Sequence, residues 1–258
     1  MLKGITVVCV VLSLCACVSI GSWKTDSASP EKADLNYWVT PPTQNELVFI
    51  GVSSRQIKPD AEVASAREDA AKKVSMYHGI RADVEAVQNV GTGYLDYFAN
   101  SKIAVEYDQQ IEQYLDKLTF DPDRDVFTRN NVVFIRFTYP AAFPGNISYH
   151  FDKNPNGSPK WTSSPPSEIG GFMAGVGFAR RQQRIRDTIV KSYESAVASL
   201  VTRISSSITA SDTSTFTQGT SFFHQQSEGR LANFLVIETW IDPSTEAVWT
   251  LAVARNAD

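Results

Sequence analysis

Two stretches of the chain place apolar side chains three and four residues apart, which is the spacing of an amphipathic helix. The apolar positions are Val63, Ala66, Ala70, Val74 and Tyr77 in the first stretch and Ile185, Ile189, Tyr193, Ala196, Leu200 and Ile204 in the second. Charged residues occupy the opposite side of each stripe. The pattern predicts two helices that each lie with one face on a sheet. Gly79 is expected to end the first helix in the usual C-terminal glycine role.

Short apolar runs bounded by turn residues predict the strands of these sheets. The runs lie at residues 47–53, 117–120, 132–139, 171–177, 233–241 and 247–254. Asp-Pro begins the turns at 121–125 and 242–245, because proline fixes φ and aspartate can bond its own backbone. These turns predict two hairpins, of which the first would join 117–120 to the strand at 132–139.

The same order of features occurs twice along the chain. A tryptophan and a Pro-Pro pair lead into a strand that reaches Gly-Val, and an offset of 124 residues aligns Gly51 with Gly175. A helix, a variable insert and a hairpin follow in both places. Each insert, at 80–116 and at 205–232, is expected to supply one more strand and a short helix such as 104–115.

We therefore predict an α+β fold of two repeated β-α-β-β modules, each a small antiparallel or mixed sheet with one long amphipathic helix packed on a face. The modules would span residues 37–140 and 167–258. The connector at 141–166 is rich in proline, which indicates an ordered but irregular segment.

The N-terminus has the pattern of an export signal. Lys3 precedes an apolar run at 5–14, which is shorter than the roughly 20 residues that span a bilayer. The end of the run, Leu14-Cys15-Ala16-Cys17, resembles a bacterial lipobox and predicts a lipoprotein signal peptide at 1–16. Cys17 would then carry the lipid, including palmitate, and 17–36 would form a flexible tether. The alternatives are the register that ends at Cys15 and an ordinary secretory signal cleaved after Ala16.

Lipidation of Cys17 would hold the protein at a membrane of the bacterial envelope, facing the periplasm. Val18 follows the cysteine, where an aspartate would favour retention at the inner membrane, so the outer membrane is the expected location.

The composition argues against several kinds of partner and catalytic site. Its 258 residues carry a net charge of −4, which argues against a sequence-independent nucleic-acid partner. All three cysteines lie in the first 17 residues, so none remains for a disulfide, a zinc cluster or a nucleophile. The three histidines have no metal-ligand spacing. We therefore expect no metal, no cofactor and no enzymatic activity.

These features resemble the bacterial twenty-kilodalton surface lipoprotein family. The resemblance rests on the lipobox, the lead-in at Trp38, the helix segment Ala66-Arg-Glu-Asp-Ala70-Ala71 and the closing strand at 248–255. A similar module occurs in the N-terminal part of a flagellar ring-assembly protein. Two copies, with a long insert in the first, depart from the usual single module. The resemblance implies an envelope-associated binding or structural role and brings no catalytic residues.

Four arginines are candidates for binding an anion or an acidic partner. Arg180, Arg181, Arg184 and Arg186 fall at the start of the second predicted helix, and arginine makes bidentate contacts to phosphate and carboxylate groups. A solvated helix face is the plainer interpretation. Cations are mildly unfavourable at a helix N-terminus, which favours a functional reason for them.

Aromatic residues in the two inserts are candidates for a partner surface. They are Tyr94, Tyr97 and Phe98 in the first insert and Phe222 and Phe223 in the second. Inserts at equivalent places could together form one binding surface with aromatic anchors. Packing of each insert onto its own sheet explains the same residues.

The sequence thus predicts a lipid-anchored envelope protein that binds another envelope protein or a copy of itself. Two alternatives stay open at this point: an enzyme acting on cell-wall glycan, and a component of flagellar or envelope assembly. Paired carboxylates in a deep cleft would favour the enzyme.

Overall fold

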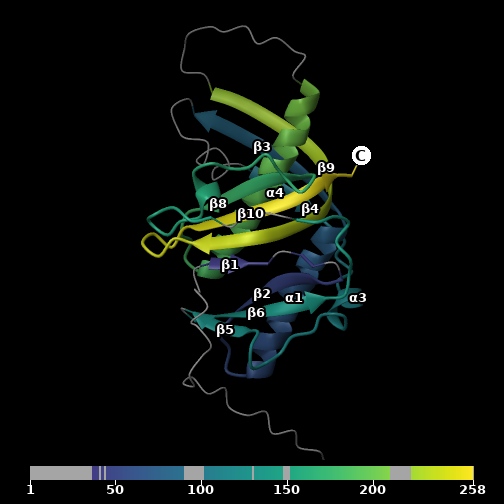
Figure 1. The fold of residues 1–258 in the computed structure, drawn as a ribbon, viewed down its shortest axis with the longest axis vertical. Helices are drawn as coiled ribbons and strands as arrows, with labels where there is room; N and C mark the ends of the chain where they lie inside the picture. The colour runs from purple at the N-terminus through teal and green to yellow at the C-terminus, as the bar shows by residue number, and fades with distance from the viewer. Residues whose placement is uncertain are drawn as a thin grey trace, which may run out of the picture. The chain divides into compact units, whose positions relative to one another are not determined.

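The computed structural model describes residues 37–40, 42–43, 45–89, 102–129, 131–147, 152–209 and 222–257 (Figure 1). The predicted signal peptide, Cys17, the predicted tether and the aromatic residues Tyr94, Tyr97 and Phe98 lie outside this part of the chain. The described part contains three α-helices and ten strands, and every strand pair is antiparallel. The predicted α+β class is confirmed.

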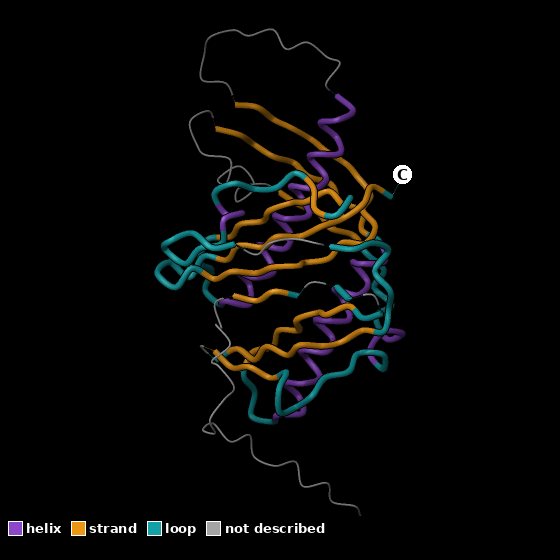
Figure 2. Tube along the Cα trace, in the orientation of Figure 1, coloured by secondary structure: helices purple, strands orange, loops and turns teal. Residues whose placement is uncertain are grey.

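The elements follow one another in a mixed order. They are β1 (Tyr37–Val39), β2 (Leu47–Ser54), α1 (Pro59–His78), β3 (Ile80–Asn89), β4 (Lys102–Glu106), α3 (Glu112–Leu115), β5 (Val126–Arg129), β6 (Val132–Tyr139), the 3-10 helix η1 (Lys160–Thr162), β7 (Glu168–Ile169), β8 (Phe172–Ala179), α4 (Ile185–Thr209), β9 (Phe222–Ile241) and β10 (Val248–Asn256). Both long helices lie on the far side of the strands in the view of Figure 2.

A three-stranded sheet, in the order β2-β6-β5, carries α1. The helix begins at Pro59, whose fixed φ suits the first turn, and its buried stripe includes Ala66, Ala70 and Val74. Gly51 lies under this stripe. A Cβ at Gly51 would overlap the Ala66 carbonyl oxygen, so glycine is what allows α1 to approach β2.

The second, larger sheet has the order β4-β3-β9-β10-β8-β7, with β1 paired to part of β9. Helix α4 packs on β8, β9 and β10. Gly177 in β8 has the same function as Gly51, since a Cβ there would overlap the Ser192 carbonyl oxygen of α4.

The two strand-loop-helix segments share further contacts between residues that are equally spaced. The Val52 N–H donates to Asp69 Oδ2 at 2.8 Å, and the Phe178 N–H donates to Ser195 Oγ at 3.1 Å. In each pair the acceptor lies 17 residues after the donor. These bonds satisfy backbone N–H groups with side chains of the covering helix.

A second pair of bonds recurs at the start of each helix. The Gln56 N–H donates to Glu62 Oε1 at 2.6 Å, and the Gln182 N–H donates to Thr188 Oγ1 at 2.9 Å. The spacing between the two segments is therefore 126 residues, and Gly51 corresponds to Gly177. The offset of 124 aligns the Gly-Val dipeptides, whereas the contacts between strand, loop and helix match at 126.

Strands of the first half extend the sheet of the second half, contrary to the interpretation in which each insert packs on its own sheet. The first ten residues of β9 pair with β3, and β4 pairs with β3 in turn. This is possible because β9 has 20 residues whereas its hairpin partner β10 has 9. Residues 34–258 form one compact unit. The module boundaries 37–140, 141–166 and 167–258 stay predictions.

The first hairpin closes at a different place from the one expected. Residues 117–120 make only the isolated bridge from Thr119 to Thr138, and the hairpin joins β5 to β6 beside Asn131. Asn131 has a φ of 63°, a left-handed conformation that asparagine tolerates. The turn at 121–125 instead leads into β5. The second predicted turn is confirmed, since Asp242 accepts bonds from the Ser244 N–H and the Thr245 hydroxyl.

Three local predictions need correction. The segment 104–115 is strand β4 followed by the four-residue helix α3, not one helix. Gly79 follows α1 and donates its N–H to the Ser75 carbonyl, but its φ of 175° is extended and not left-handed. Trp38 lies in β1, whereas Trp161 lies in η1 and is buried, so the two lead-ins differ in structure.

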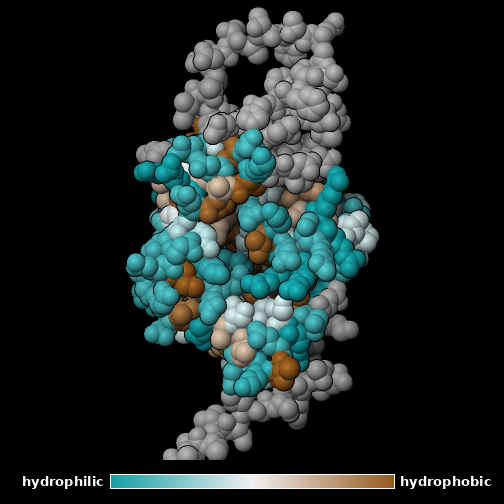
Figure 3. All heavy atoms as spheres, turned by 180° about the vertical axis from the view of Figure 1, so that it is seen from behind, coloured by the Kyte–Doolittle hydropathy of each residue, from teal (hydrophilic) through white to brown (hydrophobic). Residues whose placement is uncertain are grey.

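No helix in the described part of the chain is long and apolar enough to cross a membrane. The face of the molecule drawn in Figure 3 is mostly hydrophilic, with hydrophobic side chains in small separate groups.

Candidate functional site

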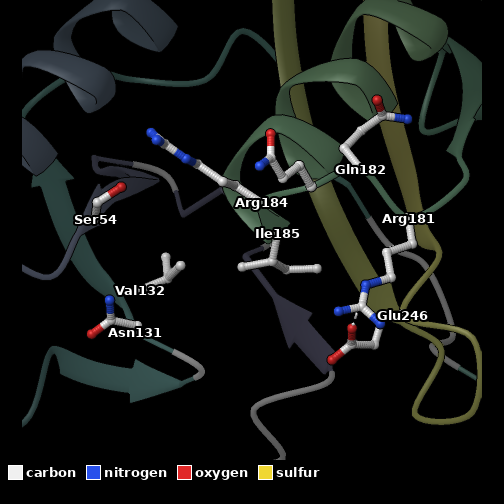
Figure 4. A pocket seen from close by; sticks show the side chains of 9 residues that line it. Ser54, Asn131, Val132, Arg181, Gln182, Arg184, Ile185 and Glu246 are labelled. Carbon is white, nitrogen blue, oxygen red and sulfur yellow. Dashed lines mark ion pairs between the residues drawn. The ribbon is translucent and has the colours of Figure 1, made fainter.

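A polar pocket lies where several strands of the two sheets end. It has a volume of about 470 Å³. Its lining residues are Ser54, Asn131, Val132, Arg181, Gln182, Gln183, Arg184, Ile185 and Glu246 (Figure 4). The lining thus comes from both halves of the sequence.

Strand pairing explains why these residues meet. Val248 lies opposite Ala179, so the turn between β9 and β10 lies beside the loop 180–184 that follows β8. Ser54 lies opposite Val132 at the end of the smaller sheet, next to the tip of the β5-β6 hairpin. The pocket is therefore bounded by two hairpin ends and by the loop that leads into α4.

Two of the four predicted arginines line the pocket. Arg184 extends toward Ser54, and Arg181 turns to Glu246, with its Nε 2.9 Å from the carboxylate (Figure 4). Within the part of the chain that the structure describes, Arg184 makes no ion pair. An arginine with an ion-pair partner and one without any among the described residues therefore share the same wall.

The other two predicted arginines lie outside the lining. Arg180 is exposed in the loop before the helix, and Arg186 is half-buried in the first turn of α4. The prediction placed all four at the helix start, but α4 begins at Ile185, so three of them belong to the preceding loop.

Sequence reasoning missed most of the polar lining. Ser54, Asn131 and Glu246 are far from the arginines in sequence and carry no motif. A signal existed in the loop itself, because Arg181-Gln182 repeats Arg55-Gln56 at the 126-residue spacing. That spacing becomes visible only once the glycines are aligned as the helices require.

A buried ion pair within α1 contacts the second half of the chain. Lys73 Nζ lies 2.8 Å from Asp69 Oδ2, donates to the Ile50 carbonyl at 2.5 Å and sits 4.8 Å from the ring centroid of Tyr193. Burial alone disfavours the ammonium, but Asp69 and Tyr193 more than offset this, so the pKa of Lys73 is raised. The contact to Tyr193 fastens α1 to α4.

An aromatic cluster surrounds His78 at the end of α1. Its ring stacks on Tyr114 at 5.4 Å, and its Nε2 lies 3.4 Å from the Tyr139 hydroxyl. Partial burial and the nearby Lys117 lower the pKa of His78. The tyrosines are buried, which makes the cluster a packing feature that holds α3 against β6.

The predicted aromatic partner surface stays a prediction. Phe222 and Phe223 begin β9, where they lie opposite Asn89 and Gln88 of β3. The residues of the first insert fall outside the described part. Among the described residues, no group of three histidine, cysteine, aspartate or glutamate side chains is placed to hold a metal ion.

The sequence matches no protein-family model, and searches of curated proteins and of solved structures found no match. The resemblance to the twenty-kilodalton surface lipoprotein family therefore stays a prediction.

Proposed function

We propose that this protein is a lipid-anchored component of the bacterial cell envelope that binds an anionic partner and catalyses no reaction. The lipid would be attached to Cys17, and the outer membrane is the proposed location. The observation that carries the binding role is Arg184, which lies in a polar pocket without an ion-pair partner among the described residues.

The lining of the pocket supports binding of an anion. Arg184 and Arg181 present guanidinium groups, and the side chains of Gln182, Gln183 and Asn131 can donate further hydrogen bonds. A volume of about 470 Å³ is in the range of small-ligand sites and would hold a phosphorylated or carboxylated group of a larger molecule.

The same lining gives little support to a glycan-acting enzyme. Among the described lining residues, Glu246 is the one carboxylate, and it is paired with Arg181. Hydrolysis of a glycosidic bond ordinarily needs two carboxylates on either side of the bond. The binding role therefore has better support than the enzymatic alternative.

We further propose that the chain contains a duplicated β-α-β-β module. The strand orders β2-β6-β5 and β8-β10-β9 both place the first strand beside the last one. The matched glycines and the matched helix-to-loop bonds at 126 residues support the same origin. The pocket would then lie between the two copies.

Two variants test the proposed function in whole cells. Cys17→Ala should remove palmitate labelling and release the protein from the membrane fraction. Arg184→Glu should deplete partners recovered by crosslinking and pull-down while leaving the anchoring intact. Lys102→Glu is the matched control, because Lys102 is exposed on β4 and only loosely paired with Glu85 at 3.6 Å. Equal recovery from Arg184→Glu and wild type would refute a role of the pocket.

A further inference from the structure

The first described strand, β1, lies at the end of the molecule that holds the pocket. Tyr37 in β1 lies opposite Trp240, one residue before β9 ends. The turn after β9 contains Glu246, which lines the pocket. Tyr37, the described residue nearest to Cys17 in sequence, therefore lies beside the pocket and not at the opposite end of the sheet.

Two basic loops occupy this same end. The loop 55–58 follows β2, and the loop 180–184 follows β8 at the equivalent position. The exposed basic residues of the two loops are Arg55, Lys58, Arg180, Arg181 and Arg184. Ile57 stands among them with its side chain 100% exposed, and Val190 is the other large hydrophobic residue exposed in the described part.

Several of the acidic residues at this end are already engaged. Glu62 is buried and accepts the Gln56 N–H beside Arg55, and Glu246 holds Arg181. Asp242 accepts the hydrogen bonds of its own turn. Asp60 and Asp187 lie in the first turns of the two helices, where their negative charge interacts favourably with the helix dipole. Lys58 and Arg184 make no ion pair with any described residue, and both are exposed.

We propose that this end of the molecule is a membrane-docking face. Lys58 and Arg184 would contact the phosphates of anionic phospholipids, and Ile57 would enter the interfacial layer of the same bilayer that holds the lipid on Cys17. This inference rests on the proposed lipid anchor and adds the bilayer as an anionic surface that the same end of the molecule contacts. An exposed isoleucine flanked by cations matches the amphipathic character of surface-bound segments.

The limited length of the chain between Cys17 and Tyr37 makes weak contacts sufficient for docking on the bilayer. Residues 18–36 can span at most roughly 65 Å, so the anchored unit stays near the bilayer but is not oriented by its anchor. At such distances the effective concentration of the membrane surface is high. Each basic residue near an anionic surface favours docking by about fivefold, so Lys58 and Arg184 together contribute roughly 25-fold.

The absence of cysteine after Cys17 provides a clean test. Lipidated Ile57→Cys and Lys102→Cys proteins are each labelled with a polarity-sensitive dye and placed in phosphatidylethanolamine vesicles with or without phosphatidylglycerol. Lys102 is the control because it lies opposite Glu85 of β3, which faces the start of β9 and not its end. We expect the dye at position 57, and not at 102, to shift to an apolar environment when phosphatidylglycerol is present. High salt should reverse the shift.

Charge variants complete the test. Lys58→Gln with Arg184→Gln, in the Ile57→Cys background, should lower the ratio of docked to undocked protein by roughly 25-fold. A dye at position 57 that stays in water on phosphatidylglycerol vesicles overturns the docking face, as does an equal response at position 102. A dye shift that occurs only when envelope protein is added also overturns the docking face, but it leaves the proposed binding role in place. Dye uptake by the wild-type protein would instead mean that Cys17 carries no lipid.

Discussion

The buried carboxylate of Asp69 offers the sharpest test of how α1 is held on the smaller sheet. It accepts hydrogen bonds from the Val52 N–H and from Lys73, both at 2.8 Å, and the Lys73 and Asp69 side chains are 12% and 11% exposed. Asp69→Ala would leave a buried ammonium and a strand N–H without their acceptor. Breaking such a pair costs about 3–5 kcal/mol of unfolding free energy.

A matched substitution in the second half separates the energetic effect of the charge from that of the hydrogen bond to the backbone. Ser195 accepts the Phe178 N–H at the position equivalent to Asp69, but it is neutral, and Ser199 takes the place that Lys73 has in α1. Ser195→Ala should therefore cost about 1–2 kcal/mol, the penalty for one unsatisfied buried donor. Adding Lys73→Met to Asp69→Ala should recover part of the larger loss, because it removes the stranded charge.

The assay is equilibrium urea unfolding of the mature chain with Cys17→Ala, followed by far-ultraviolet circular dichroism. Folding raises the pKa of Lys73 above its usual 10.5, so the stabilisation by this lysine is complete below that pH and is lost as the pH rises through the folded pKa. A smaller loss in Asp69→Ala than in Ser195→Ala would refute the reasoning. So would a loss that the added Lys73→Met change leaves untouched.

Three further predictions concern other parts of the fold. Gly177→Ala should lower the free energy of unfolding by about 1–3 kcal/mol, because the added Cβ would overlap α4. Gly79→Ala, with open space around its Cβ position, should leave thermal unfolding nearly unchanged. The pKa of His78 is lowered by burial and Lys117, so unfolding free energy should fall as the pH drops through its unfolded pKa of about 6.5, and His78→Phe should flatten that slope. Asn131→Gly should leave the free energy of unfolding close to wild type in thermal unfolding, while Asn131→Val should lower it by about 1–2 kcal/mol through strain at a φ of 63°.

Local patterns predicted much of the fold. The 3.6-residue periodicity of Val63 to Tyr77 and of Ile185 to Ile204 located both long helices, because it depends only on neighbouring turns of the same helix. The apolar run at 132–139 matches β6 without adjustment. These elements lie in the core of their halves, where burial makes the pattern strong.

Local sequence patterns could not predict which distant strands pair with each other. Nothing in residues 80–89 indicates that β3 pairs with β9, some 140 residues later, instead of with β6. The hairpin beside Asn131 was missed for a different reason, since the Asp-Pro turn nearby carries stronger turn chemistry. Strand order is set by packing and register over the whole sheet, which a local pattern does not report.

The candidate site shows the same division between local and distant information. Arg181 and Arg184 could be singled out because they cluster in sequence, but their difference could not. Arg181 is neutralised by Glu246, which the β9-β10 turn brings to it, whereas no described residue forms an ion pair with Arg184. Strand β1 adds a third element at this end, because it pairs beside Trp240. A charge cluster thus gains its meaning from what the fold places next to it. Here the fold places, at one end of the sheet, an arginine with no ion pair among the described residues, an exposed isoleucine and the start of β1.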